Sequence, residues 1–207
     1  MRARITLSLA LLLMVFTLSV IADEQQKLSF RHDVLPVLSK AGCNGGGCHG
    51  ALSGKGGFRL SLNAYDPVID HYNITRENRG RRIEFFAPAR SLFVTKPTAA
   101  VRHKGGKVLH ENSEAYRILI RWIQQGAPGP SENDPTIERL EFERILPQLR
   151  KGQTQQLSVR AFFNDGTERD VTRWARFTST DATVAEVDEA SGLVKVIGHG
   201  QGAVTAW

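Results

Sequence analysis

Sulfur is scarce in this chain, which has two methionines, Met1 and Met14, and two cysteines, Cys43 and Cys48, among 207 residues. Beyond residue 14 no thioether side chain is therefore available as a metal ligand. Two cysteines alone cannot complete the tetrahedral site that zinc prefers, so a zinc site would also need histidines or carboxylates. A long tract of Lys and Arg is missing too, although the net charge is +6, which argues against a nucleic-acid partner.

The N-terminus has the layout of a secretory signal peptide. Arg2 and Arg4 precede the apolar run ITLSLALLLMVFTLSVIA, and Val20 and Ala22 place small residues where a signal peptidase reads them. We expect residues 1–22 to be removed, which exports the protein to the periplasm or cell surface. The alternative is an uncleaved anchor, since a run of about eighteen apolar residues can just span a bilayer. A membrane is a partner only in that case.

Residues 28–128 are predicted to form a small helical domain. An apolar stripe with helical spacing ends at Gly42 and comprises Phe30, Val34, Leu35, Val37 and Leu38. A second helix is expected in SEAYRILIRWIQQGAP, capped by Ser113 and stopped by Gly126. Its apolar face comprises Tyr116, Leu119, Ile120 and Ile123, widened by Ile118 and Trp122. The long middle, rich in Gly, Arg and Pro, is expected to be irregular and to wrap around something.

Beyond a linker at residues 129–135 the pattern changes to period two. The runs IERLEFERI, QQLSVRAFF, RDVTRWARFTS, TVAEV and GLVKVIG are short and alternating, and turn signals such as NDG separate some of them. Residues 136–207 are thus predicted to form an antiparallel β-sandwich. The expected core strands carry Leu157, Val159, Ala161 and Phe163; Val184, Ala185 and Val187; and Leu193, Val194, Val196 and Ile197. The fold class is multidomain α plus β.

The stretch CNGGGCHG, residues 43–50, contains both cysteines and places His49 directly after the second. In an exported chain, two such cysteines most often form a structural disulfide. A zinc site is a second possibility, but it would need further ligands at spacings that match no known finger. The candidates for those ligands are His71, His103 and His110.

Covalent haem is the third interpretation. Two cysteines can bind a porphyrin through thioether bonds while the following histidine ligates the iron, usually in the motif C-x-x-C-H. Here four residues separate Cys43 from Cys48, so two extra residues must bulge outward. Glycine makes such a bulge at little conformational cost, which would explain Gly45–Gly47. The haem interpretation accounts for both the glycines and His49, whereas the disulfide accounts for neither.

The region from Phe30 to Pro128 resembles the planctomycete-type cytochrome c-like domain. The resemblance covers about a hundred residues and is carried by FRLSLNAYDP at 58–67, GRRIEFFAPARSLFVTKP at 80–97, HKGGK at 103–107 and the helix ending RWIQQGAP. It implies one covalent haem c, attached through Cys43 and Cys48, with His49 as the proximal iron ligand. It also implies transfer of electrons to or from a redox partner protein.

The ligand on the other side of the iron cannot be a methionine once the signal segment has been removed. His103 lies where the resembling family has its histidine, so we expect it to be the distal ligand, with His110 and His71 as lesser candidates. His103 as a solvated loop residue, with a five-coordinate iron, is the alternative. His32 and His199 are expected to be uninvolved. Two imidazoles stabilise ferric iron relative to imidazole plus thioether, so we predict a lower reduction potential than that of a His/Met centre.

A group of basic residues lies in the middle of the helical part. We expect some of them to pair with the haem propionates or to steer an acidic redox partner, the alternative being a solvated loop. They are Arg76, Arg79, Arg81, Arg82, Lys96, Arg102, Lys104 and Lys107.

Residues 136–207 resemble the bacterial Ig-like domain of group 2. The resemblance is carried by KGQTQQLSVRAFFNDGT, by STDATVAEVDEASGLVKVIGHGQGAVTAW and by Trp174 between them. Relatives usually have one further strand, so we expect the domain to be incomplete at Trp207. Such modules act as spacers or bind surfaces.

The sequence therefore favours an exported electron-transfer protein with a covalent haem over an enzyme. A haem-free adhesion or scaffold module with a Cys43–Cys48 disulfide is the main alternative. A third interpretation is a catalytic haem with an open iron position that acts on peroxide.

Overall fold

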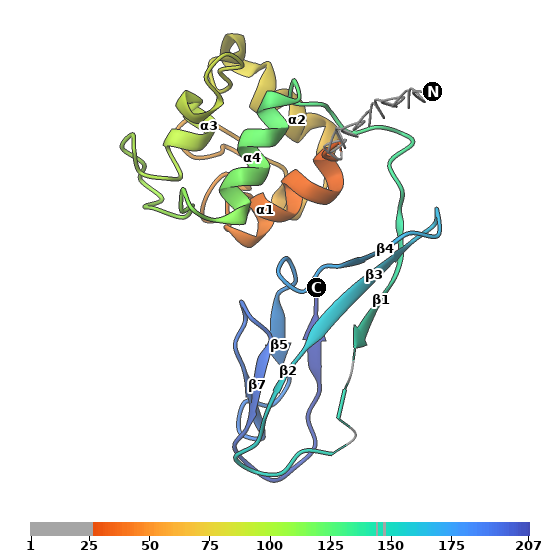
Figure 1. Cartoon of the computed structure of the whole chain (residues 1–207). Coiled ribbons are helices and arrows are strands. Elements are labelled where there is room, and N and C mark those ends of the chain that lie inside the picture. The colour runs from red at the N-terminus through yellow and green to blue at the C-terminus, as the bar shows by residue number, and fades with distance from the viewer. Residues whose placement is uncertain (1–26, 144, 147) are drawn as a thin grey trace, which may run out of the picture.

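The computed structural model describes residues 27–207 except 144 and 147, so the predicted signal peptide at residues 1–22 lies outside the described residues. A helical part and a β part follow one another along the chain (Figure 1), and each has its own hydrophobic core. Within the described residues, no helix has both the length and the apolar character needed to cross a membrane.

The first predicted helix is present as a π-helical turn, η1 (Phe30–Val34), that continues into α1 (Leu35–Lys40). All five residues of the predicted apolar stripe are buried. The Ser29 side chain accepts a hydrogen bond from the His32 backbone N–H at 3.2 Å, and the Asp33 carboxylate accepts one from the Ser29 N–H at 2.7 Å. This reciprocal pair satisfies N–H groups that a helix start leaves free. The helix ends before Gly42, whose φ of +72° lies in the left-handed region.

The helix α4 (Glu114–Gln124) confirms the second prediction, including the cap in which Ser113 accepts from the Tyr116 N–H at 3.2 Å. Its buried face differs from the expected one. Ile118, Leu119, Trp122 and Ile123 are buried, whereas Tyr116 and Ile120 are only partly so. Trp122 lies at the centre of the buried face and is fully buried against aromatic side chains from η1 and α3.

The middle of the helical part is more regular than predicted. It contains the helices α2 (Pro67–Thr75) and α3 (Leu92–Thr95). The 3₁₀ turn η2 (Leu62–Ala64) precedes α2, and the turns η3 (Glu77–Gly80) and η4 (Pro88–Arg90) lie between α2 and α3. The start of α2 has a recognisable signal, because Asp66 caps the Ile69 N–H and Pro67 occupies the first turn. Its apolar periodicity is misleading, however, because α2 buries Asp70 and Asn73 and exposes Val68, Ile69 and Tyr72.

The β part consists of antiparallel strand pairs, as expected. Three sheets are formed, with the strand orders β1-β3-β4, β2-β7-β6 and β5-β8. The strands are β1 (Ile137–Glu143), β2 (Thr154–Gln156), β3 (Ser158–Phe163), β4 (Glu168–Asp170), β5 (Phe177–Ser179), β6 (Ala185–Val187), β7 (Leu193–Val196) and β8 (Val204–Ala206).

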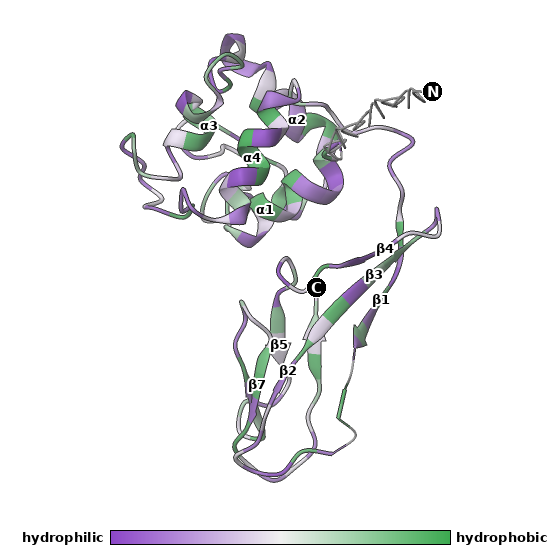
Figure 2. Ribbon diagram, in the orientation of Figure 1, coloured by the Kyte–Doolittle hydropathy of each residue, from purple (hydrophilic) through white to green (hydrophobic). Residues whose placement is uncertain are grey.

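The core of the β part follows the period of two only where strands are regular. Leu157, just before β3, is buried together with Val159, Ala161 and Phe163, and Figure 2 shows the alternation of hydrophilic and hydrophobic residues along β3. In the last predicted core strand, only Val194 and Val196 are buried, while Leu193 is 45% exposed and Ile197 is half-buried. Successive side chains of a strand face opposite sides, so four neighbours cannot all reach one core. Val184, Ala185 and Val187 are likewise only half-buried.

The two parts contact each other beside the C-terminal end of α1. The Lys40 ammonium donates a hydrogen bond to the Ala190 carbonyl at 2.8 Å, and Trp174 packs against the helical core. An ion pair of 3.4 Å joins Arg169 to Asp33. These contacts lie next to the segment that leads into Cys43.

Candidate functional site

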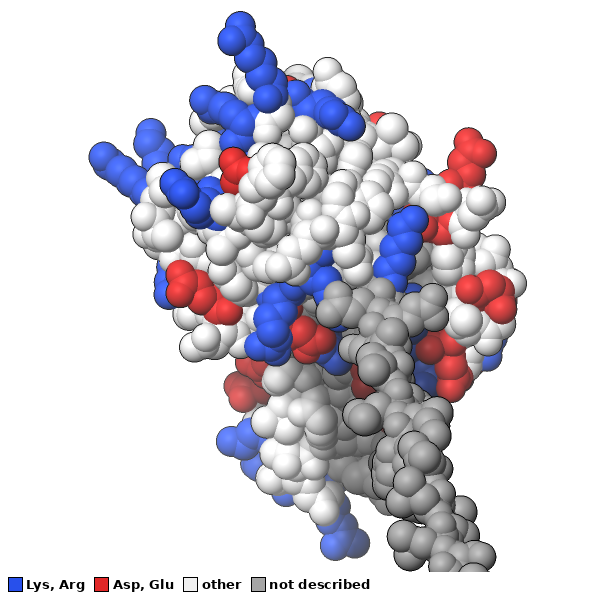
Figure 3. All heavy atoms as spheres, turned by 45° about the horizontal axis from the view of Figure 1, so that its top comes forward, with Lys and Arg blue, Asp and Glu red and all other residues white. Residues whose placement is uncertain are grey.

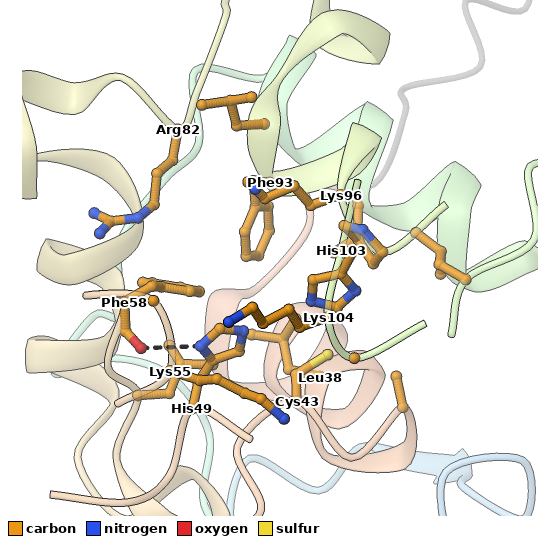
Figure 4. Close-up of a pocket in the computed structure, with 18 of the residues that line it drawn as sticks. Leu38, Cys43, His49, Lys55, Phe58, Arg82, Phe93, Lys96, His103 and Lys104 are labelled. Carbon is orange, nitrogen blue, oxygen red and sulfur yellow. Dashed lines mark hydrogen bonds between the residues drawn. The ribbon is translucent and has the colours of Figure 1, made fainter. Parts of the chain in front are cut away.

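A cavity of about 460 Å³ opens in the helical part (Figure 4). Its walls come from α1, from residues 55–60, from α3 with the loop that follows it, and from α4. Most of the wall is apolar, with Val37, Leu38, Phe58, Leu60, Leu92, Phe93, Leu109 and Leu119. This volume lies in the range of small-molecule and cofactor sites. The irregular segment that was expected to wrap around something thus supplies much of the lining.

The loop after α1 brings Cys43 and His49 to this cavity. The Cys43 N–H donates to the Leu38 carbonyl at 2.9 Å, and the His49 N–H donates to the Cys43 carbonyl at 2.9 Å. The chain closes so tightly behind them that a Cβ on Gly50 would lie 2.0 Å from the Asn44 carbonyl oxygen. Glycine is therefore required at position 50 for steric reasons.

The run Gly45–Gly47 lies in the loop between the two cysteines. None of these three glycines has a φ in the left-handed region, and a Cβ on Gly46 or Gly47 would meet nothing within 4 Å. The loop as described therefore does not itself require glycine at positions 46 and 47, and the expected bulge around a haem stays a prediction. The glycines leave open space beside the loop between the two thiols.

The imidazole of His49 is held in one orientation and one tautomer. Its Nδ1 lies 2.9 Å from the carbonyl oxygen of Phe58, an acceptor, so Nδ1 carries the proton and Nε2 keeps a free lone pair. Burial lowers the pKa of His49, an effect that the neighbouring positive groups His103, Lys55 and Arg82 reinforce, although the bond to Phe58 opposes it. At neutral pH the ring is therefore uncharged, as a metal ligand must be.

His103 is fixed in the same way from the opposite side. Its Nδ1 lies 2.8 Å from the carbonyl oxygen of Gly106, which again leaves Nε2 free. Gly105 packs directly on the ring, because a Cβ at that position would lie 2.7 Å from Cε1 of His103. The two glycines of HKGGK thus differ in role: the Gly106 carbonyl accepts a hydrogen bond from His103, and Gly105, which has no side chain, leaves room for the His103 ring.

The two imidazoles lie across the same space with nearly parallel planes. Their ring centroids are 6.3 Å apart and the interplanar angle is 15°, and Figure 4 shows the rings facing one another. Two imidazoles that ligate one metal ion from opposite sides have centroids about 6 Å apart, since each metal–nitrogen bond is about 2 Å. The centroid distance of this pair is close to that spacing, and both rings line the same cavity, so the structure brings together the two histidines nominated from the sequence.

The two cysteines differ in their surroundings. Cys43 lines the cavity and packs against the hydrophobic core, and burial, together with the nearby Cys48, raises the pKa of the Cys43 thiol to about 11. Cys48 is not among the lining residues. Both cysteines are free thiols, and no disulfide joins them.

Cationic side chains lie at the cavity, and no carboxylate does among the described residues. Of the eight basic residues singled out above, Arg81, Arg82, Lys96, Arg102 and Lys104 line it, whereas Arg76, Arg79 and Lys107 do not. Figure 3 shows Lys and Arg side chains gathered on the helical part. A ligand with an apolar body and negative groups matches this lining.

The remaining histidines lie elsewhere. His71 bonds to the Ala127 carbonyl at 2.8 Å and packs on Trp122, and His32 bonds to the Pro135 carbonyl at 2.6 Å. His110 is exposed, and His199 lines a wider hollow in the β part. In the chain as described, no group of three or more His, Cys, Asp or Glu side chains is placed to hold a metal ion, so zinc gains no support.

Three features of the site were missed from the sequence. Lys55 lines the cavity, the backbone carbonyl of Phe58 fixes His49, and Gly105 makes room for His103. Every residue has a backbone carbonyl, so the sequence could not show that the Phe58 carbonyl is the acceptor for His49. The paired glycines after His103 were the one available signal.

Comparison with known families identifies the β part. Residues 145–207 match the bacterial Ig-like domain (group 2), which agrees with the antiparallel strands and with the sequence resemblance. The match begins after β1, so it is shorter than the predicted 136–207. No curated protein matches the chain.

Proposed function

We propose that residues 28–128 form a cytochrome c-like domain that binds one haem c, and that the protein transfers electrons. In this proposal Cys43 and Cys48 are the thioether anchors, His49 is the proximal iron ligand and His103 is the distal one. The observation that carries it is the pair of parallel imidazoles, 6.3 Å apart, each with Nδ1 bonded to a backbone carbonyl.

The residues around the cavity fit this group. The apolar walls suit a porphyrin ring, Cys43 lies in the lining, and the cations can neutralise carboxylates. Cys48 would have to reach the same ligand from outside the lining. The open space beside Gly46 and Gly47 permits the loop to shift for that purpose.

Different residues of the chain would orient the iron ligands and exclude water from the cavity. A bound haem supplies one-electron chemistry. The Phe58 and Gly106 carbonyls would orient the two imidazoles with Nδ1 as the donor and Nε2 available, which would also raise their basicity as ligands. Phe58, Phe93 and the leucines exclude water, and a low-dielectric pocket is one of the factors that set a haem potential.

A pigment assay tests the proposal. The full chain is produced in a host with haem-attachment machinery, and the denatured, reduced sample in alkaline pyridine is expected to show the sharp bands of thioether-linked haem. Intact mass should exceed that of the chain by one haem, and Cys43→Ser should reduce the attached haem, with Ser53→Ala, an exposed loop change, as the control. A colourless product with only a Cys43–Cys48 cystine would overturn it and leave the haem-free scaffold.

The coordination and potential follow from the same pair of histidines. The native ferric protein is expected to be six-coordinate and low-spin, and its reduction potential should lie below that of a His/Met centre. A five-coordinate high-spin spectrum would instead favour the peroxide-active interpretation.

The location and the β part complete the proposal. An N-terminal segment with the layout of a signal peptide supports export to the periplasm or cell surface, where haem attachment to cysteines takes place in the proposed scheme. The Ig-like part then serves as a spacer or surface-binding module beside the redox domain, and the redox partner is a protein.

A further inference from the structure

Helix α2 turns its polar side inward. Asp70, Asn73 and Thr75 are buried beside Ile74, while Val68, Ile69 and Tyr72 face solvent. Such an inversion is unfavourable by burial alone, because buried polar groups lose water and must be compensated by hydrogen bonds. Asp70 and Arg82, on the following segment, are also the only buried charged side chains among the described residues. The hydrogen bonds that compensate the burial of Asp70 and Arg82 therefore indicate what these two side chains do.

Asp70 holds the segment on one side of His49. Its carboxylate accepts hydrogen bonds from the backbone N–H of Ser61 at 2.5 Å and from the Ser61 hydroxyl at 2.7 Å. Leu60, the residue before Ser61, donates its N–H to the His49 carbonyl at 2.8 Å. The buried carboxylate thus fixes the chain that bonds to the His49 backbone.

Arg82 holds the segment on the other side. Its guanidinium donates to the Asn73 carbonyl at 2.7 Å and to the Gly57 carbonyl at 3.3 Å, and it pairs with the Glu77 carboxylate at 2.9 Å. It also lies 4.4 Å from the centre of the Phe58 ring, in a cation–π contact. One side chain therefore joins α2 and η3 to Gly57 and Phe58.

The Phe58 carbonyl is the group that accepts the Nδ1 proton of His49. Gly57 and Phe58 belong to a short turn closed by hydrogen bonds between Lys55 and Phe58 of 3.1 and 3.3 Å. Two backbone bonds alone leave such an exposed turn free to tilt, and a tilt would move the acceptor away from the ring. Arg82 restrains the turn from inside the protein.

We propose that Asp70 and Arg82 are positioning residues for His49, acting through Ser61 and through Gly57–Phe58 respectively. They keep the His49 ring facing the cavity with the proton on Nδ1. The inference assigns Arg82 to this task and not to the carboxylates of a ligand, since both of its terminal NH2 groups already contact backbone carbonyls and Glu77. It rests on the proposed function only in the role it gives to His49.

The decisive experiment uses the haem-free full chain with ¹⁵N-labelled histidine. Nitrogen NMR at pH 8 is expected to show both His49 and His103 as Nδ1–H tautomers. In Arg82→Gln the preference of His49 for that tautomer should fall at least threefold, the scale of one backbone-type hydrogen bond. His103, whose acceptor is Gly106, should be unchanged and serves as the internal reference.

Matched variants separate positioning from general folding. Arg76→Gln changes an exposed cation that does not line the cavity, so it should leave both histidines unaltered. Asp70→Asn retains an acceptor for the Ser61 N–H and should keep most of the wild-type signal, whereas Asp70→Ala should broaden the His49 resonances. Phe58→Leu keeps the carbonyl but removes the cation–π contact, and it provides a milder variant if Arg82→Gln does not fold.

The outcomes distinguish the inference from the function. A folded Arg82→Gln protein in which His49 keeps its wild-type tautomer ratio would overturn the positioning role, whatever the pigment assay gives. A colourless wild-type protein would overturn haem binding without affecting the tautomer result. If both hold, the haem-loaded Arg82→Gln protein should show a high-spin fraction and a shifted potential that Arg76→Gln does not show.

Discussion

The helical part and the β part bury their side chains for different purposes. The helical part buries two side chains of charged residue types, Asp70 and Arg82. It also contains a mostly apolar cavity that His49 and His103 line. The β part buries mainly aliphatic and aromatic side chains, with Gln155 as its one buried polar residue among those described. Its ion pairs, such as Arg139 with Glu141, are exposed. The two parts thus differ in whether charged side chains with hydrogen-bond partners lie in their interior.

The largest effect is expected when one histidine is replaced in each part, which tests whether only the helical part carries the functional site. His49→Ala is expected to abolish the low-spin spectrum of the haem-loaded protein, because one axial nitrogen is lost. His199→Ala, in the hollow of the β part, should leave the spectrum unchanged. Visible absorption and electron paramagnetic resonance measure both. An unchanged low-spin signal in His49→Ala would remove the basis for treating the helical part as the functional one.

The next effect concerns the core of the β part. Phe177 is 1% exposed, so Phe177→Ala should cost about 3–5 kcal/mol of unfolding free energy through lost burial and the cavity left behind. Denaturant unfolding followed by circular dichroism measures it. The exposed neighbour provides the control, since Thr178→Ala should change stability by less than about 0.5 kcal/mol. A loss in Phe177→Ala as small as in the control would show that the β part has no cooperative core.

Cys43 provides a smaller test on the side of the cavity. Because burial raises the pKa of its thiol to about 11, little thiolate exists at pH 8. In haem-free Cys48→Ser protein, alkylation of Cys43 should be roughly a hundredfold slower than in the same protein unfolded in urea. The rate should rise about tenfold per pH unit as the pH approaches 11. Equal rates in the folded and unfolded chains would contradict the burial of this thiol.

The smallest expected effect lies between the two parts. Trp174 is half-buried against the helical core, so Trp174→Ala should cost about 1–2 kcal/mol. The loss should also separate the unfolding of the two parts into two steps, seen by comparing tryptophan fluorescence with haem absorbance. Glu186→Ala on β6, which is exposed, is the control. A single unchanged transition in Trp174→Ala would mean that the parts are joined by the remaining contacts alone.

Several elements could be read from residue order because local physics decides them. The Ser113 cap and the Gly42 stop act within one helical turn, so α4 and α1 were predicted correctly. The alternation at Val159, Ala161 and Phe163 shows directly on which side β3 packs. Helix α2 was missed because its burial does not follow its hydropathy. It buries Asp70 and Asn73 beside Ile74, and the hydrogen-bond partners of these polar residues, such as Ser61 and Arg82, lie outside the helix.

The candidate site also has features that the sequence could predict and features that only the structure shows. The sequence could nominate His49 because it follows a cysteine, and His103 because it lies where the resembling family has its histidine. It could not supply the carbonyl of Phe58, the distance between the rings or the absence of Cys48 from the lining. Nor could it give the conformation of Gly45–Gly47, because a glycine run shows only that many conformations are permitted.

The order of residues alone determined the change from helical to alternating pattern near residue 130, the helix ends and the set of possible ligands. These depend on neighbours a few positions apart, for which propensity and capping suffice. Only the tertiary structure decided which two of the histidines face one another, which cations surround the cavity and why Asp70 and Arg82 are buried. Each of these is a contact between segments separated by loops, and its free energy depends on burial and distance, neither of which exists until the chain has folded.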